Sequence, residues 1–178
     1  MEGIVSLLDE EHTCLTEGLW AELEHEFGLR GISVTPFPHF SHHVAQGYDK
    51  EALGLILQRM AQHTQAFQIQ ASGLGIFPGL APVLYVPVIR TRELSQFHAS
   101  VWQHTAHTAS GTIDHYRPEN WLPHITLAMI DTHKDNLPNV IRLLGERPLH
   151  WHIAVDNLSF IEDTGQGQRV RFRFEFRG

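Results

Sequence analysis

Pro38-His39-Phe40-Ser41 and Pro123-His124-Ile125-Thr126 are two copies of one pattern: proline, histidine, an apolar residue and a hydroxyl residue. Side chains two positions apart in a β-strand point to the same face. The histidine and the hydroxyl of each copy should therefore share a face, while Phe40 and Ile125 point to the opposite face, toward a core. A histidine beside a hydroxyl, presented twice, can bind a phosphate and transfer protons on both sides of it.

The segments that follow the two motifs repeat in the same order. Leu74, near the end of an expected strand, lies 35 residues after His39, and Leu158 lies 34 residues after His124. A helix precedes each of these strands, and a final strand follows each, at 83–89 and at 170–176. This internal repeat predicts two similar α+β lobes related by an approximate two-fold axis, with the motif strands facing each other across one cleft.

Apolar periodicity and turn residues predict the remaining elements. The first helix should bury Leu15, Leu19 and Leu23, and Asp49 should cap the second helix. The first expected helix runs from the acidic residues at 9–11 to residue 27, and the other helices span 50–62, 92–108 and 134–145. The expected strands span 3–8, 32–35, 39–45, 67–77, 83–89, 121–130, 149–161 and 170–176, and a polar loop spans 109–120.

Composition limits the class of ligand. The chain has 178 residues, 42% of them hydrophobic, and a net charge of −7, with two lysines and no basic run. Proteins that bind long duplex nucleic acid usually carry a basic face, so a short or small phosphate-bearing ligand is expected. Arg169, Arg171, Arg173 and Arg177 should share one face of the last strand, either as a solvated face or as a local phosphate-binding wall.

The same composition favours a cytoplasmic protein. The single cysteine, Cys14, cannot form an internal disulfide, which is typical of a reducing compartment. The apolar runs are too short to cross a membrane, and the first residues lack the features of a secretory signal. We expect one bilobal domain over residues 1–178, monomeric and without a protein partner.

The paired motifs resemble those of the two-histidine (2H) phosphoesterase superfamily, and within it the 2′,5′ RNA ligase-like and cyclic phosphodiesterase proteins. That family carries two His-x-Thr/Ser-x motifs, one in each lobe of a bilobal α+β fold, about 80 to 90 residues apart; here the two histidines are 85 residues apart. The sequence Asn120-Trp121-Leu122-Pro123-His124-Ile125-Thr126-Leu127 is close to the family's form. The first motif departs from it, because His42 takes the usually apolar fourth position.

The resemblance implies a fold with antiparallel sheets flanking a central cleft and with helices outside. It implies that His39 and His124 act as acid and base, and that Ser41 and Thr126 bind phosphate, without a metal or other cofactor. The substrate would be a short RNA or nucleotide with a 2′,3′-cyclic phosphate or a 2′,5′ linkage. His43, which strand alternation places beside His39 and Ser41, is a candidate substrate contact, as are Phe77, Tyr116 and Arg117.

Two alternatives stay open at this stage. The departure at His42 is consistent with a phosphate- or nucleotide-binding module that has lost turnover. The 14 histidines also allow a metal-dependent hydrolase, for which His150 and His152, alternating on one strand, are the nearest to a ligand pair. The pattern at 150 and 152 offers no third ligand at a suitable spacing.

Overall fold

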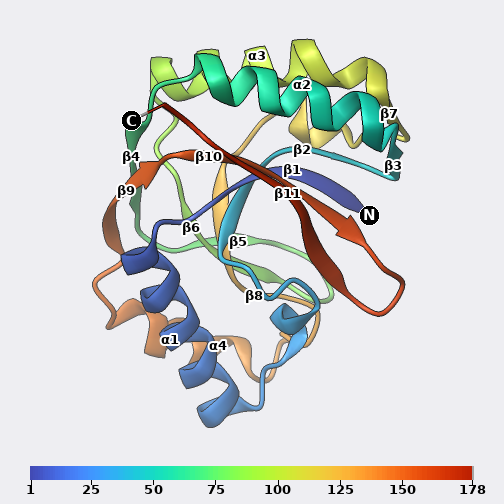
Figure 1. Ribbon diagram of the computed structural model, residues 1–178. Coiled ribbons are helices and arrows are strands. Elements are labelled where there is room, and N and C mark those ends of the chain that lie inside the picture. Colours follow the sequence, from blue (N-terminus) through green and yellow to red (C-terminus); the bar gives the residue numbers. More distant parts are fainter. Residues whose placement is uncertain (178) are drawn as a thin grey trace.

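Two antiparallel sheets form the centre of the computed structural model, which describes residues 1–177 (Figure 1). The larger sheet has the strand order β11-β10-β1-β2 and the smaller has the order β5-β6-β8. Two further pairs of strands, β4-β9 and β3-β7, complete the strand pairing. The strands of the larger sheet are β1 (Glu2–Leu7), β2 (His39–Ala45), β10 (Asn157–Asp163) and β11 (Gln168–Glu175); those of the smaller are β5 (Gly75–Phe77), β6 (Val83–Pro87) and β8 (His124–Ala128). The paired strands are β4 (Phe67–Ser72), β9 (His150–Val155), β3 (Gly47–Tyr48) and β7 (Ala109–Ser110).

The helices lie on the outside in two groups (Figure 1). Helices α2 (Lys50–His63) and α3 (Arg92–Thr105) cover the larger sheet, where α2 contacts β10 and β11 and α3 contacts β2. Helices α1 (Glu10–Phe27) and α4 (Leu137–Gly145) lie at the other end of the molecule, and α1 contacts β8. Within residues 1–177, none of the helices combines the length and apolar character that crossing a membrane requires.

The two halves of the chain are related as the repeat predicted, but with a different pairing of elements. Strand β1 lies between β2 and β10, and β6 lies in the same way between β8 and β5. The helix after β1 packs on β8, and the helix after β6 packs on β2. Strand β6 is therefore the counterpart of β1 and opens the second half. The expected equivalence of 83–89 with 170–176 is wrong, because β11 pairs with β10 at the far edge of the larger sheet.

Helix boundaries follow local capping signals. The Asp9 side chain accepts a hydrogen bond from the His12 amide at the start of α1, and Gly28 ends that helix with a positive φ of 70°. The Asp49 side chain accepts from the Ala52 amide at the start of α2, as expected. In α1, Leu19 and Leu23 are buried, whereas Leu15 is exposed. The buried stripe continues through Thr16 and His12 instead.

Three expected strands differ in the structure. Residues 32–34 belong to the 3-10 helix η1 (Gly31–Val34), and Thr35 is its C-cap. The first amide of η1 donates to the Asp131 carboxylate. Residues 149–161 divide at Asp156 into β9 and β10, which belong to different sheets. Residues 67–77 likewise divide into β4 and β5 at Gly73, where φ is +86°. A change of sheet within an apolar run leaves little trace in the local hydrophobic pattern.

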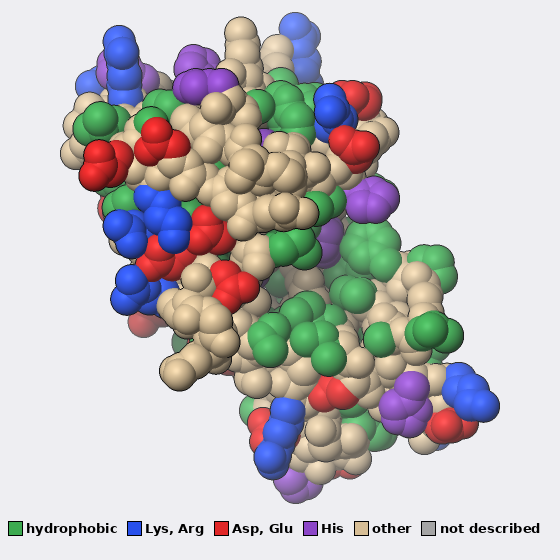
Figure 2. All heavy atoms as spheres, turned by 90° about the vertical axis from the view of Figure 1, so that its right-hand side faces the viewer, with side chains coloured by type: hydrophobic (Ala, Val, Ile, Leu, Met, Phe, Trp, Pro, Cys, Tyr) green, Lys and Arg blue, Asp and Glu red, His purple; other side chains and the backbone are tan. Residues whose placement is uncertain are grey.

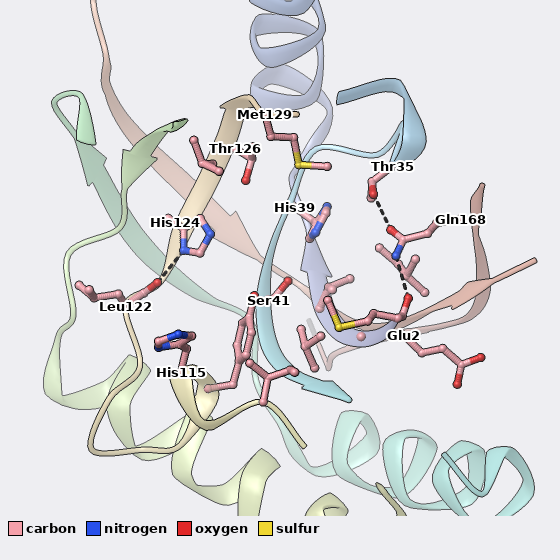
Figure 3. A pocket seen from close by; sticks show the side chains of 18 of the residues that line it. Glu2, Thr35, His39, Ser41, His115, Leu122, His124, Thr126, Met129 and Gln168 are labelled. Carbon is pink, nitrogen blue, oxygen red and sulfur yellow. Dashed lines mark hydrogen bonds between the residues drawn. The ribbon is translucent and has the colours of Figure 1, made fainter. Parts of the chain in front are cut away.

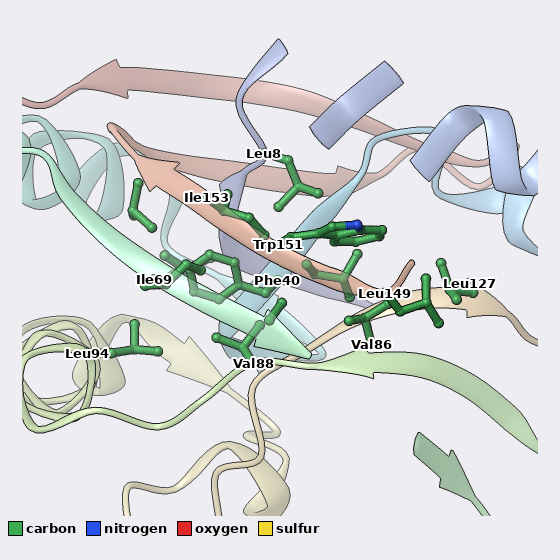
Figure 4. Close-up of a cluster of buried hydrophobic side chains, with 14 of the residues drawn as sticks. Leu8, Phe40, Ile69, Val86, Val88, Leu94, Leu127, Leu149, Trp151 and Ile153 are labelled. Atoms are coloured by element: carbon green, nitrogen blue, oxygen red, sulfur yellow. The ribbon is translucent and has the colours of Figure 1, made fainter. Parts of the chain in front are cut away.

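The core lies between the sheets and beneath the helices, where side chains from β2, β4, β6, β8 and β9 meet (Figure 4). Phe40 is 1% exposed and Ile125 is 0% exposed. Both motif strands therefore direct their apolar residue into the core, as predicted. The expected loop at 109–120 contains β7 and the short 3-10 segment η3 (Asp114–Tyr116), and a second 3-10 segment, η2 (Ala106–Thr108), precedes it.

Candidate functional site

The two motif strands meet at one cleft. Strands β2 and β8 are edge strands of their respective sheets and contact each other at the centre of the molecule. The cleft has a volume of about 640 Å³, and His39, Ser41, His124 and Thr126 all line it. Figure 3 shows the two imidazoles projecting from opposite walls toward the same space, with the two hydroxyl side chains beside them. The structure thus brings together all four residues expected to act on phosphate.

Each imidazole is oriented by a backbone carbonyl two residues before it. His39 Nδ1 lies 2.6 Å from the Phe37 carbonyl oxygen, and His124 Nδ1 lies 2.7 Å from the Leu122 carbonyl oxygen. A carbonyl only accepts hydrogen bonds, so Nδ1 is the protonated nitrogen in both rings. In the neutral imidazole this leaves Nε2 with a free lone pair, which can accept a proton in the cleft.

Burial lowers the pKa of both histidines. For His39 the largest cause is desolvation, the nearby charge of His124 lowers the pKa further, and the hydrogen bond to Phe37 opposes these effects. For His124 desolvation again lowers the pKa, and the hydrogen bond to Leu122 raises it in part. Both rings are therefore neutral near pH 7, and protonation of one makes protonation of the other harder.

A β-bulge occurs at the fourth position of both motifs. Val5 pairs with Ser41 and Ile4 with His43, so His42 has no partner on β1. Tyr85 pairs with Thr126 and Leu84 with Ala128, so Leu127 has no partner on β6. A bulge places two successive side chains on one face. In each motif the next two residues are accordingly buried, and Val44 and Met129 return to the cleft.

The bulge corrects the expectation for His43, which is fully buried and absent from the cleft wall. Its Nδ1 lies 2.5 Å from the Tyr48 hydroxyl, and its ring packs on Trp102.

His42 is also fully buried and takes the position that Leu127 has in the other half. Its Nε2 lies 2.9 Å from the Ser6 hydroxyl, and its ring stacks on Trp121. Desolvation holds the pKa of His42 well below its usual value, so a neutral imidazole fills an apolar position.

Two tryptophans connect the halves behind the site. The Trp121 indole, from the second half, donates to the Ser41 carbonyl at 2.8 Å. The Trp20 indole, from the first half, donates to the Thr126 carbonyl at 3.1 Å. Edge strands leave such carbonyls without a partner on one side. Each indole therefore anchors the backbone of the motif's hydroxyl residue, Ser41 or Thr126, from the opposite half.

Comparison with protein families agrees with this arrangement. The model of the 2′-5′ RNA ligase superfamily matches residues 14–167, which include both motifs. The chain belongs to this superfamily of 2H phosphoesterases. A search of curated protein sequences found no match.

Solved structures show the same 2H fold. The protein TT0787 of Thermus thermophilus has a TM-score of 0.65 at 17% identity, over 99% of this chain and 98% of that chain. Usb1 of Kluyveromyces marxianus has a TM-score of 0.50 at 12% identity, over 95% of this chain and 96% of that chain. At these identities the likeness shows the fold, and the expected bilobal α+β arrangement is confirmed.

Of the other three residues expected to contact a substrate, two line the cleft and one does not. Phe77 lines the cleft, where its ring meets the His124 ring edge-on at 4.9 Å between centroids. Tyr116 also lines the cleft, and burial raises the pKa of its hydroxyl, which interacts with the Ser41 side chain. Arg117 is exposed outside the cleft wall, where it pairs with Asp114 at 2.8 Å.

The arginines of the last strand lie on its exposed face and line no part of the cleft. Arg169 and Arg171 pair with Glu162, and Arg173 pairs with Glu175. Arg177 lies beyond the end of β11, so three of the four expected arginines share this face. A phosphate-binding wall made of them is wrong, and the solvated face is confirmed for Arg169, Arg171 and Arg173.

Several cleft residues had no distinctive sequence signal. Figure 3 shows His115 and Leu122 on one side of the motif histidines, Thr35 and Gln168 on the other, and Met129 beside Thr126. They come from segments far apart in the chain, so no local spacing links them. Of these residues, only His115 could have been expected in the cleft from the sequence, because it is adjacent to Tyr116 in the polar loop before the second motif.

The histidines considered for metal binding lie elsewhere on the surface. His150 Nδ1 lies 3.0 Å from the Ser72 hydroxyl, and His152 Nε2 lies 3.0 Å from the Gln70 amide nitrogen. Within residues 1–177, no group of three or more His, Cys, Asp or Glu side chains is arranged to hold a metal ion. The residues at this face therefore do not form a metal centre of the kind that a metal-dependent hydrolase requires.

Proposed function

We propose that this 2H phosphoesterase hydrolyses nucleoside or RNA 2′,3′-cyclic phosphates by acid–base catalysis with His39 and His124. The observation that carries the proposal is that both imidazoles face one cleft with Nδ1 tied to a carbonyl. Each Nε2 is then free to exchange a proton with a phosphate ester bound between them. The reverse reaction, which joins a hydroxyl to a cyclic phosphate, would use the same groups.

In the proposed reaction a water molecule attacks the phosphorus. One neutral histidine takes a proton from the water, and the other, protonated, gives a proton to the departing ribose oxygen. The P–O bond to that oxygen breaks, and the product is a phosphomonoester beside a free ribose hydroxyl. Each proton transfer accelerates the reaction by roughly 10²–10⁴. Acid and base both come from side chains, so this mechanism needs no metal.

Ser41 and Thr126 would donate hydrogen bonds to the non-bridging oxygens of the phosphate. Both hydroxyls lie on the cleft wall beside the imidazole of their own strand. Donors that are already in place when negative charge develops stabilise the transition state without reorganisation. The anchoring of both backbones by Trp20 and Trp121 supports this role.

The test is hydrolysis of a nucleoside 2′,3′-cyclic phosphate in excess chelator. His39→Asn and His124→Asn are the sharpest variants, because the amide nitrogen of asparagine can replace Nδ1 as donor to the carbonyl but offers no titrating group. Each should lower kcat by about 10² or more. His104→Asn, on the exposed face of α3, is the matched control. Full turnover in both motif variants would overturn the proposal.

The binding-module alternative loses the observation that motivated it. His42 lies in the core as the counterpart of Leu127 and leaves the first motif's cleft face intact. Binding of a cyclic phosphate without turnover, on a broad panel of nucleotides, would be the result that favours this alternative.

A further inference from the structure

The walls of the cleft are apolar and carry little charge. Apart from the two motif histidines, the lining side chains include Val5, Val44, Ile113 and Ile161. Within residues 1–177, no lysine or arginine lines the cleft, and the one acidic residue on its wall is Glu2. Met1 also lines the cleft, and its amino group pairs with Asp163 at 2.9 Å. Figure 2 shows the same distribution: hydrophobic side chains surround the hollow, and most basic and acidic side chains lie away from it.

Basic residues around the cleft-wall residue Glu2 are paired with carboxylates. Lys50 lies 2.8 Å from Glu2 and 2.9 Å from Glu162. Glu162 also binds Arg169 and Arg171, and these three cations hold its pKa at about 2. The positive charges of Lys50, Arg169 and Arg171 are therefore paired with the carboxylates of Glu2 and Glu162.

The arginines in and near the loop before the second motif also have partners outside the cleft. Arg117 pairs with Asp114, and Arg90 donates to the carbonyls of Trp121 and Pro118. The polar side chains that this loop places on the cleft wall are His115, Tyr116 and Asn120, none of which is a permanent cation. These side chains can hydrogen-bond to a base or a ribose.

We propose that the substrate carries a single phosphate on an otherwise uncharged nucleoside, and that oligonucleotides and nucleotides with a second phosphate are poor substrates. This inference rests on the proposed function. One cyclic phosphate with charge −1 matches the two imidazoles, of which one is protonated in the reactive state. A second phosphate would lose hydration beside apolar walls without a cation to replace it, which is unfavourable. The nucleoside itself would gain from burial against the same walls.

The experiment compares adenosine 2′,3′-cyclic phosphate with the same compound bearing a 5′-phosphate, and with a dinucleotide ending in a cyclic phosphate. We expect kcat/KM to be about tenfold lower for both larger substrates at low salt, because the added charge is desolvated without compensation. Raising the salt should change kcat/KM of the unmodified substrate little. Phosphate recognition by a basic surface would instead produce a steep fall with salt.

A charge placed on the wall tests the cause. Asn120→Lys adds a cation to the cleft wall and should raise kcat/KM for the 5′-phosphorylated substrate relative to the unmodified one. Gln103→Lys adds the same charge to the exposed side of α3, outside the cleft wall, and should leave that ratio unchanged.

The two proposals fail in different ways. Turnover that depends on His39 and His124, but that is equal or faster with the 5′-phosphate or the dinucleotide, would overturn the single-phosphate inference alone. Absence of such turnover on all three compounds would overturn the proposed function and this inference with it.

Discussion

Three buried histidines should make the fold sensitive to mild acid. His42, His43 and His98 are each fully buried, and desolvation lowers the pKa of His43 and of His98 to about 4. Their ordinary value is 6.5. Between these two pKa values the three histidines bind protons in the unfolded chain but not in the folded chain. Stability is complete above pH 6.5 and is lost as the pH falls from 6.5 toward 4.

The size of the effect follows from these pKa values. For one group with a pKa of about 4 when folded and 6.5 when unfolded, lowering the pH from 7 to 5 reduces the free energy of unfolding by about 2 kcal/mol. His43 and His98 together contribute about 4 kcal/mol, and His42, whose pKa burial also holds well below its ordinary value, adds to this. The free energy of unfolding of a typical domain is about 5–15 kcal/mol, so this loss is a large fraction of the total stability.

The assay is urea unfolding followed by circular dichroism at pH 7 and at pH 5. With a slope of about 2 kcal/mol per molar urea, the midpoint should fall by about 2 M. This range of pH lies above the window of the buried carboxylate Glu162, whose pKa of about 2 makes its contribution fade only at lower pH. The histidines can therefore be observed separately.

The matched variants are His98→Gln and His104→Gln on the same helix. Glutamine at 98 can keep a donor for the His42 carbonyl, which His98 Nε2 now contacts at 2.9 Å, but it does not titrate. His98→Gln should reduce the difference between the midpoints at pH 7 and pH 5, whereas His104→Gln should not. Equal midpoints at the two pH values in the parent chain would refute the reasoning.

Four further outcomes are expected. The pH profile of kcat/KM should be bell-shaped with its maximum below pH 6.5, because burial lowers the pKa of both motif histidines; a flat profile between pH 5 and 8 would contradict the acid–base pair. Thr126→Val and Ser41→Ala should each lower kcat by about 10², and Thr126→Ser should retain most activity in the same assay. Trp20→Phe removes the donor to the Thr126 carbonyl and should lower kcat by about tenfold with little change in KM. A lower kcat accompanied by a raised KM and a lower thermal midpoint would indicate a structural role only. Gly75→Ala would drive a methyl group into the Tyr85 ring, so its thermal midpoint should fall, and an unchanged midpoint would show that the ring moves freely.

Much of the candidate site was readable from local pattern. Proline, histidine and a hydroxyl at fixed spacing identify His39 and His124, and alternation along a strand places Ser41 and Thr126 on the same face. The similar distances from each motif to its later strand indicated a duplication. These features depend on neighbours within a few residues or on simple repetition, which is why one sequence suffices to find them.

The tertiary structure decided what alternation cannot. The bulges at His42 and Leu127 arise from register against β1 and β6, and they move His43 into the core. Pairing across the chain also determines that β6 is the counterpart of β1 and that 149–161 forms two strands in different sheets. No local signal encodes such pairing, because it depends on partners tens of residues away.

The sequence alone was therefore enough to identify the two Pro-His-x-hydroxyl motifs as the candidate site and to predict that they face one cleft. Only the folded chain shows that both copies bulge at the same position, and that a neutral histidine fills the apolar place in the first. It also shows a cleft wall without lysine or arginine among residues 1–177. The chemistry of a motif is local, but the surroundings that select its substrate are assembled from the whole chain.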